Sequence, residues 1–90
     1  MPKKAAHRNY KTPDQIQFDF LIGINISKYR GFNRMSQKDL AERILISTQT
    51  LSEWENGKQS ISAYHLKQIA KTFNIKVEDL LFFEDERKFS

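Results

Sequence analysis

The chain has 90 residues, a formal net charge of +4 at neutral pH and no cysteine. This length suits one small domain that buries about 60% of its unfolded surface, and it excludes a second domain. The absence of cysteine excludes disulfides, thiolate metal ligands and a cysteine nucleophile. No apolar run reaches the roughly 18 residues that a membrane span requires. We therefore expect a soluble, cytoplasmic protein.

Residues 1–15 are predicted to form a basic, flexible arm. Four lysines or arginines and one aspartate give this segment a net charge of +3, which leaves +1 for the rest of the chain. Similar basic extensions reach into a minor groove or follow phosphates. The folded domain is expected over residues 16–83, followed by a short charged tail over residues 84–90.

Apolar residues after this arm recur every three or four positions, which predicts amphipathic helices. The first helix is expected from Ile16 to Tyr29, the second from Gln37, and the third over residues 48–55. Two further helices follow, over the apolar runs that precede and follow Asn74. Serine or threonine caps are expected at Thr12, Ser36, Ser47 and Ser62. The predicted apolar positions are Phe18, Ile22, Ile26 and Tyr29, then Leu40, Ala41 and Ile44, then Leu51 and Trp54, then Leu66, Ile69, Ala70 and Phe73, and finally Val77, Leu80 and Leu81.

Three segments, LAERI, ISTQTLSEWENGK and LKQIAKTFNIKVEDLL, resemble the phage repressor and Cro-like (XRE-type) helix-turn-helix domain. The resemblance covers residues 21–82 or so and implies a compact all-α fold of five helices that binds double-stranded DNA. Two positions depart from the family pattern, because Leu45 stands where glycine is usual and Ile61 where proline is frequent. A non-glycine residue in the left-handed region costs about 1 kcal/mol, although an irregular turn can also be built without that conformation.

The resemblance places the start of the third helix, and the positions one turn later, against the bases. Gln49 is the leading candidate, because a glutamine amide can form two hydrogen bonds with N6 and N7 of adenine. A carboxylate at Glu53 is repelled by phosphates unless it accepts from N4 of cytosine. The alternative is a solvated polar helix face. The predicted base-contacting residues are Thr48, Gln49, Ser52 and Glu53.

Phosphate contacts are expected at both ends of the third helix and at the start of the second, where helix N-termini offer backbone N–H groups. Gln37 matches the glutamine with which the family contacts phosphate. Lys38 and Arg43 are equally compatible with ordinary surface charges. The predicted phosphate-contacting residues are Gln37, Lys38, Ser47, Asn56, Lys58 and Gln59.

The family also pairs an arginine late in the first helix with the glutamate that closes the third. In this chain the resemblance implies a structural ion pair between Arg30 and Glu55, and the alternative is two unpaired surface residues. Loss of Glu55 is then expected to destabilise the fold before it alters specificity.

Three phenylalanines near the C-terminus exceed what a five-helix domain is expected to bury. At least one of Phe82, Phe83 and Phe89 is therefore expected to cover a partner surface. A homodimer is the expected use, because a two-fold dimer reads two half-sites about 34 Å apart.

The predicted function is that of a sequence-specific transcriptional regulator, a repressor that binds an inverted repeat as a homodimer. The alternative is a protein-interaction module, such as an antitoxin, that binds a toxin or polymerase through the arm and the aromatic tail. His7 and His65 are isolated from carboxylate clusters, so no catalytic residue, metal, cofactor or small-molecule substrate is expected.

Overall fold

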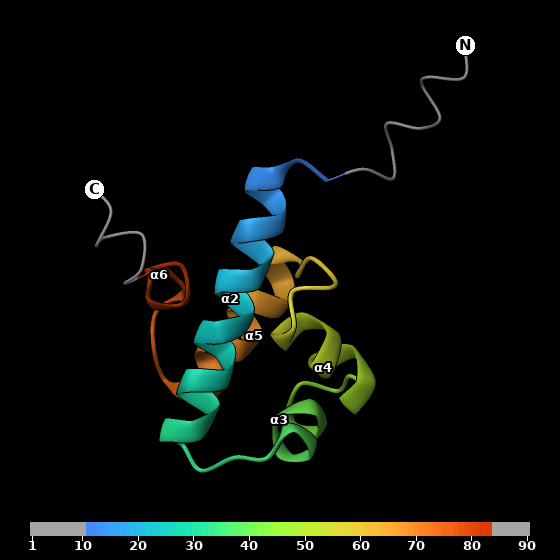
Figure 1. The fold of residues 1–90 in the computed structure, drawn as a ribbon. Coiled ribbons are helices and arrows are strands. Elements are labelled where there is room, and N and C mark those ends of the chain that lie inside the picture. Colours follow the sequence, from blue (N-terminus) through green and yellow to red (C-terminus); the bar gives the residue numbers. More distant parts are fainter. Residues whose placement is uncertain (1–10, 84–90) are drawn as a thin grey trace.

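The computed structural model describes residues 11–83. This part of the chain contains helices and no strand, which confirms the predicted all-α fold of five helices. None of its helices is long and apolar enough to cross a membrane. The helices are α2 (Pro13–Phe32), α3 (Gln37–Arg43), α4 (Thr48–Glu55), α5 (Ala63–Phe73) and α6 (Val77–Leu80) (Figure 1).

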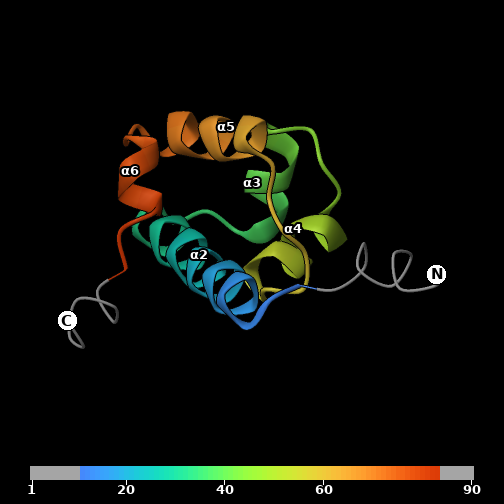
Figure 2. The ribbon, with the colours of Figure 1, turned by 90° about the horizontal axis from the view of Figure 1, so that it is seen from above.

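Helix α2 is the longest element, and seen from above it lies opposite α5 (Figure 2). Helices α3 and α4 lie on one side of it and α6 lies on the other (Figures 1 and 2). Helix α5 spans the distance between these two sides (Figure 2). This arrangement separates the helix-turn-helix segment from the end of the described chain.

The predicted caps set the starts of four helices. Thr12, Ser36, Ser47 and Ser62 each accept a hydrogen bond from the backbone N–H three residues later. Helix α2 begins at Pro13, so the last three residues of the predicted arm are helical, and it continues three residues beyond Tyr29. Proline is suited to a first helical position because the N–H that it lacks would have no helical partner there.

Most of the predicted apolar positions form the core. Ile22, Ile26, Leu40, Leu51, Ile69 and Leu80 are fully buried. The prediction was wrong for Phe18, which is 41% exposed while Leu21 is buried, and for Leu81, which follows the end of α6 and is 38% exposed. The ring of Phe18 instead packs against Phe83 from the surface.

Lys11, assigned by sequence to the arm, is tied to the fold. Its Nζ lies 2.6 Å from Oδ2 of Asp19, a buried residue on α2. The same carboxylate accepts from Gln15 and from Ser60, which follows α4. Burial raises the pKa of Asp19, but the hydrogen bonds from Lys11, Ser60 and Gln15 outweigh it and hold the pKa below its ordinary value. The charged form of Asp19 therefore connects α2 to the loop after α4.

Phe83 belongs to the core of its own chain, which corrects its prediction as a dimer-interface residue. It is 7% exposed and its ring packs edge-on against Phe18, with centroids 5.8 Å apart. The buried side chain of Asn25 donates to the carbonyl oxygens of Leu80, at 2.8 Å, and of Phe82, at 2.9 Å. These bonds hold the chain after α6 against α2, so that Phe83 turns inward. Phe89 lies outside the described residues.

Candidate nucleic-acid interface

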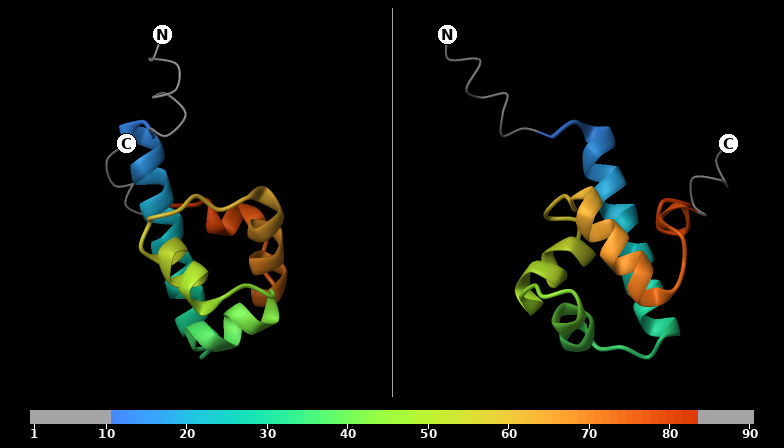
Figure 3. Two further views of the ribbon diagram at one scale, coloured as in Figure 1. Left: turned by 90° about the vertical axis from the view of Figure 1, so that its right-hand side faces the viewer. Right: turned by 180° about the vertical axis from the view of Figure 1, so that it is seen from behind.

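A tight turn joins α3 to α4 (Figure 3). Ile44 is buried at the end of α3, and Leu45 follows with a left-handed φ of 60° and 90% exposure. The N–H of Ile46 then donates to the carbonyl of Ala41 at 3.0 Å, which reverses the chain. Ser47 caps α4 by accepting from the N–H of Thr50 at 3.0 Å. Leu45 thus adopts the conformation for which the family uses glycine.

Helix α4 has one buried side and one side turned away from the core. Leu51 and Trp54 form the buried side. Trp54 contacts the ring of His65, at a centroid distance of 5.1 Å, and is not available to stack on a base. Of the predicted base-contacting residues, Thr48 and Gln49 are exposed and Ser52 and Glu53 are half-buried.

Glu53 accepts hydrogen bonds from two glutamine amides. Nε2 of Gln59 lies 2.7 Å from Oε1, and Nε2 of Gln49 lies 3.5 Å from Oε2. Sequence reasoning named all three residues and missed these bonds. Gln49 and Glu53 are four residues apart on one helix, a spacing that predicts contact between their side chains. The contact between Gln59 and Glu53 depends on the path of the loop after α4, which the sequence does not give.

The predicted phosphate-contacting residues surround α4. Lys38, Ser47, Asn56, Lys58 and Gln59 are exposed. Asn56 closes α4 by donating from Nδ2 to the carbonyl of Ser52 at 2.9 Å. Neither Lys38 nor Lys58 forms an ion pair with any residue from 11 to 83.

Arg30 and Glu55 form a bidentate ion pair between α2 and the end of α4. Nε of Arg30 donates to Oε2 at 2.8 Å and Nη2 donates to Oε1 at 3.0 Å. The Glu55 side chain is only 5% exposed. Nη1 of Arg30 also donates to the carbonyl of Met35 at 2.9 Å, so the same guanidinium holds the segment that leads into α3.

Two further donors converge on Glu55. Oγ of Ser27 lies 2.9 Å, and Nε2 of Gln37 lies 3.0 Å, from Oε1. Burial raises the pKa of Glu55, but the hydrogen bonds from Arg30, Gln37 and Ser27 outweigh it and lower the pKa. The Glu55 carboxylate also raises the pKa of Arg30. The amide of Gln37, at the first position of α3, is therefore oriented by a charged and buried carboxylate. Ser27 was missed by sequence reasoning.

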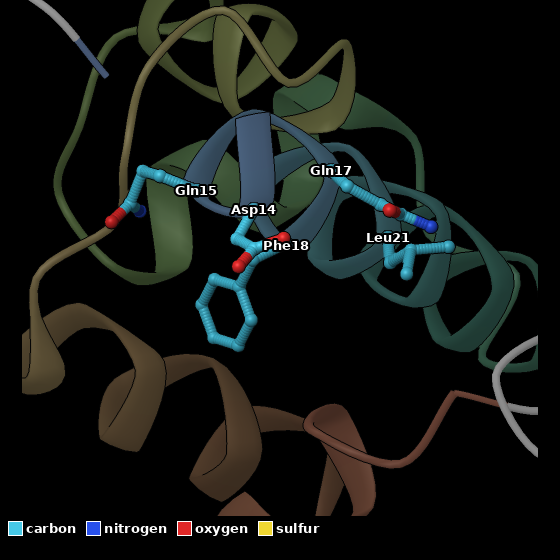
Figure 4. Close-up of a pocket in the computed structure, with 5 residues that line it drawn as sticks. All are labelled: Asp14, Gln15, Gln17, Phe18 and Leu21. Carbon is cyan, nitrogen blue, oxygen red and sulfur yellow. The ribbon is translucent and has the colours of Figure 1, made fainter. Parts of the chain in front are cut away.

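One pocket is lined by Met35, Asp39, Glu42 and Arg43, on α3 and the segment before it. Another, beside the first half of α2, is lined by Asp14, Gln15, Gln17, Phe18 and Leu21 (Figure 4). Its only titratable lining side chain is Asp14. Within the described residues no three histidine, aspartate or glutamate side chains come close enough to hold a metal ion.

The paired short helices, the left-handed turn and the polar outer side of α4 define a helix-turn-helix domain. The chain matches the helix-turn-helix family over residues 26–80 and belongs to it, as an XRE-type domain of the class found in DNA-binding transcriptional regulators. This family match confirms the resemblance that the sequence motifs indicated.

Similar proteins carry the same domain. The chain is 38% identical over 58 residues to the uncharacterized HTH-type transcriptional regulator MJ0272 of Methanocaldococcus jannaschii, covering 64% of this chain and 88% of that protein. It is 33% identical over 61 residues to the antitoxin PezA of Streptococcus pneumoniae, covering 68% of this chain but 39% of PezA. The crystal structure of the clp gene regulator ClgR from Corynebacterium glutamicum is similar with a TM-score of 0.69 and 25% identity, covering 71% of this chain and 68% of that chain.

Proposed function

We propose that this protein is a sequence-specific repressor that binds an inverted repeat in double-stranded DNA as a homodimer. The observation that carries the proposal is the outer side of α4, where exposed polar side chains start directly after the Ser47 cap. A helix presented in this way fits the major groove, where side-chain donors and acceptors distinguish the four base pairs. Thr48, Gln49, Ser52 and Glu53 are the proposed base-contacting residues.

The Glu55 network supports the proposed position of the domain on the DNA backbone. Glu55 holds Gln37, a proposed phosphate contact, at the N-terminus of α3, and its ion pair with Arg30 fixes this carboxylate in place. Lys58 follows the C-terminal end of α4 and its exposed ammonium group fits a phosphate. Lys38, Ser47, Asn56 and Gln59 complete the proposed phosphate contacts. Such contacts fix the register of the helix in the groove.

The proposed dimer surface lies on the side of α2 that faces away from α4. Phe82 is 49% exposed, and so in part are its neighbour in sequence, Leu81, and Phe18, which packs on Phe83. Because α6 and α4 lie on opposite sides of α2, pairing through this surface leaves both recognition helices accessible (Figures 1 and 2). A dimer bound in this way blocks the DNA that it covers, which is the reason for proposing repression.

Two alanine variants test the proposed division between base and phosphate contacts. Gln49→Ala is expected to cost about 1 to 3 kcal/mol of binding and to relax one base position, because it removes a two-bond contact with a base. Lys58→Ala is expected to weaken all duplexes alike and to lower the salt slope by about one, because it removes one phosphate contact. Binding is measured on an enriched duplex and on variants changed one base pair at a time.

Lys71→Ala is the matched control, because Lys71 is an exposed lysine in the last turn of α5, near α6. It is expected to leave both specificity and salt slope unchanged. If Gln49→Ala and Lys58→Ala also leave binding unchanged, α4 is not the reading helix.

A second candidate function is a protein-interaction module of the antitoxin type. It is favoured by the similarity to an antitoxin and by three exposed apolar side chains spaced four apart on α2, at Ile16, Phe20 and Ile24. DNA binding falls steeply between about 50 and 200 mM salt through counterion release, whereas an apolar protein interface responds little. The salt dependence of the tightest interaction that this chain makes therefore separates the two functions.

A further inference from the structure

Glu53 places a negative charge on the side of α4 that carries the proposed base readers. Both of its oxygens have a glutamine amide as donor, Gln59 at 2.7 Å and Gln49 at 3.5 Å. No lysine or arginine among residues 11–83 forms an ion pair with it. Its neighbours are therefore neutral amides, one on the same helix and one on the following loop.

The loop after α4 fixes the position of this carboxylate. The N–H of Lys58 donates to the backbone carbonyl of Glu53 at 2.8 Å, which turns the chain back over the end of α4. Gly57 makes this turn possible with a left-handed φ of 73°. Gln59 thereby reaches the Glu53 side chain, and its Nε2 donates the shorter of the two amide hydrogen bonds to that carboxylate, at 2.7 Å.

A fixed carboxylate determines which way the Gln49 amide faces. An ionised carboxylate only accepts hydrogen bonds, while a glutamine amide has two N–H donors on one atom and an acceptor on the other. Nε2 of Gln49 must therefore face Glu53, and Oε1 must face away from it. One N–H and the carbonyl oxygen of Gln49 are left for a base.

We propose that Glu53, held by Gln59, is a positioning residue that makes Gln49 select adenine over guanine. The inference rests on the proposed function, in which α4 reads double-stranded DNA. In the major groove adenine offers the acceptor N7 and the donor N6, whereas guanine offers two acceptors, N7 and O6. The groups that Glu53 leaves available on Gln49 match adenine. Guanine would place O6 against Oε1 of Gln49, or would require Gln49 to leave Glu53.

The test compares Glu53→Ala, Gln59→Ala and the control Glu78→Ala by competition between four duplexes that differ only at the base pair read by Gln49. Glu78 is an exposed carboxylate on α6, so its removal changes net charge equally. Glu53→Ala is expected to reduce the preference for adenine over guanine by about fivefold or more. Gln59→Ala is expected to reduce it less, and Glu78→Ala to leave it unchanged.

A double variant provides a readout that a purely structural role would not affect. With Gln49→Ala already present, Glu53→Ala is expected to produce no further change in preference at this base pair, because the side chain that it positions is gone. Thermal unfolding of every variant is measured as well, so that base preferences are compared only between folded proteins.

Two results would overturn the inference alone. One is an equal change in affinity for all four duplexes in Glu53→Ala. The other is an intact adenine preference together with a lost cytosine preference at a neighbouring pair, which would show that Glu53 contacts a base, as proposed above, without positioning Gln49. A wild-type protein without any sequence preference would overturn the proposed function, and this inference with it.

Discussion

Leu45 is held in a conformation that its side chain disfavours and gains little from packing. Its φ is 60° and it is 90% exposed. Leu45→Gly is therefore expected to stabilise the fold by about 0.5 to 1 kcal/mol, because relief of left-handed strain exceeds the added freedom of the unfolded chain. Urea unfolding measures the change.

Lys67→Gly is the control for Leu45→Gly, because Lys67 is exposed in the middle of α5. It is expected to destabilise the fold by about 1 kcal/mol, the usual cost of glycine inside a helix. Equal destabilisation by both variants would show that the turn between α3 and α4 stores no strain at Leu45.

Glu55 makes stability depend on pH. Its pKa is lowered from an ordinary value of 4.5, so the folded state binds this proton less readily than the unfolded state. The stabilisation is present at neutral pH and is lost as the pH falls below 4.5 through the pKa of the folded state. Asp19 contributes in the same direction. The free energy of unfolding, measured by urea at several pH values, is therefore expected to fall steeply in acid.

Glu55→Gln separates this contribution from that of other carboxylates. The variant is expected to lose roughly 2 kcal/mol at neutral pH, because Arg30 loses its charged partner, and to show a shallower fall in acid. Glu78→Gln, an exposed change on α6, serves as the control. An unchanged acid slope in Glu55→Gln would place the pH dependence elsewhere.

At the scale of elements, the crossing of α2 and α4 depends on the absence of one side chain. A Cβ added at Gly23 would lie 2.5 Å from the backbone carbonyl oxygens of both Trp54 and Glu55. Gly23→Ala is therefore expected to cost about 3 kcal/mol or more, because backbone must move to admit the methyl group. Thermal and urea unfolding measure this cost.

Gly31 offers a matched control on the same helix. A Cβ added there meets nothing within 4 Å, so Gly31→Ala is expected to stabilise the domain by up to about 1 kcal/mol through helix propensity. If Gly23→Ala is tolerated as well as Gly31→Ala, α2 and α4 are not in backbone contact.

The element boundaries were predictable because short-range chemistry sets them. Ser36 with Asp39, Ser47 and Ser62 are caps whose hydrogen bonds stay within one turn. Asn74 takes the left-handed conformation at the end of α5, to which asparagine is suited. Arg34 and Leu45 take the same conformation without such a preference, because the turns on either side of α3 are imposed by packing.

At the scale of the whole molecule, the departures from prediction arise from contacts between distant residues. Phe83 is buried because Asn25, far away in sequence, binds the carbonyls of Leu80 and Phe82. Phe18 remains partly exposed because it covers the ring of Phe83 from outside the core. Local periodicity carries no information on either contact. The bounds of α4 needed no such contact, because its Ser47 cap and its buried residues Leu51 and Trp54 lie within or next to the helix itself.

Whether α4 reads double-stranded DNA is measured by selection of bound sequences from a random duplex pool. The enriched duplex is then titrated at two salt concentrations. We predict a two-fold symmetric site with half-sites about 34 Å apart. Affinity should fall steeply between about 50 and 200 mM salt. Recovery of no motif, with binding that does not distinguish one duplex from another, would contradict the account.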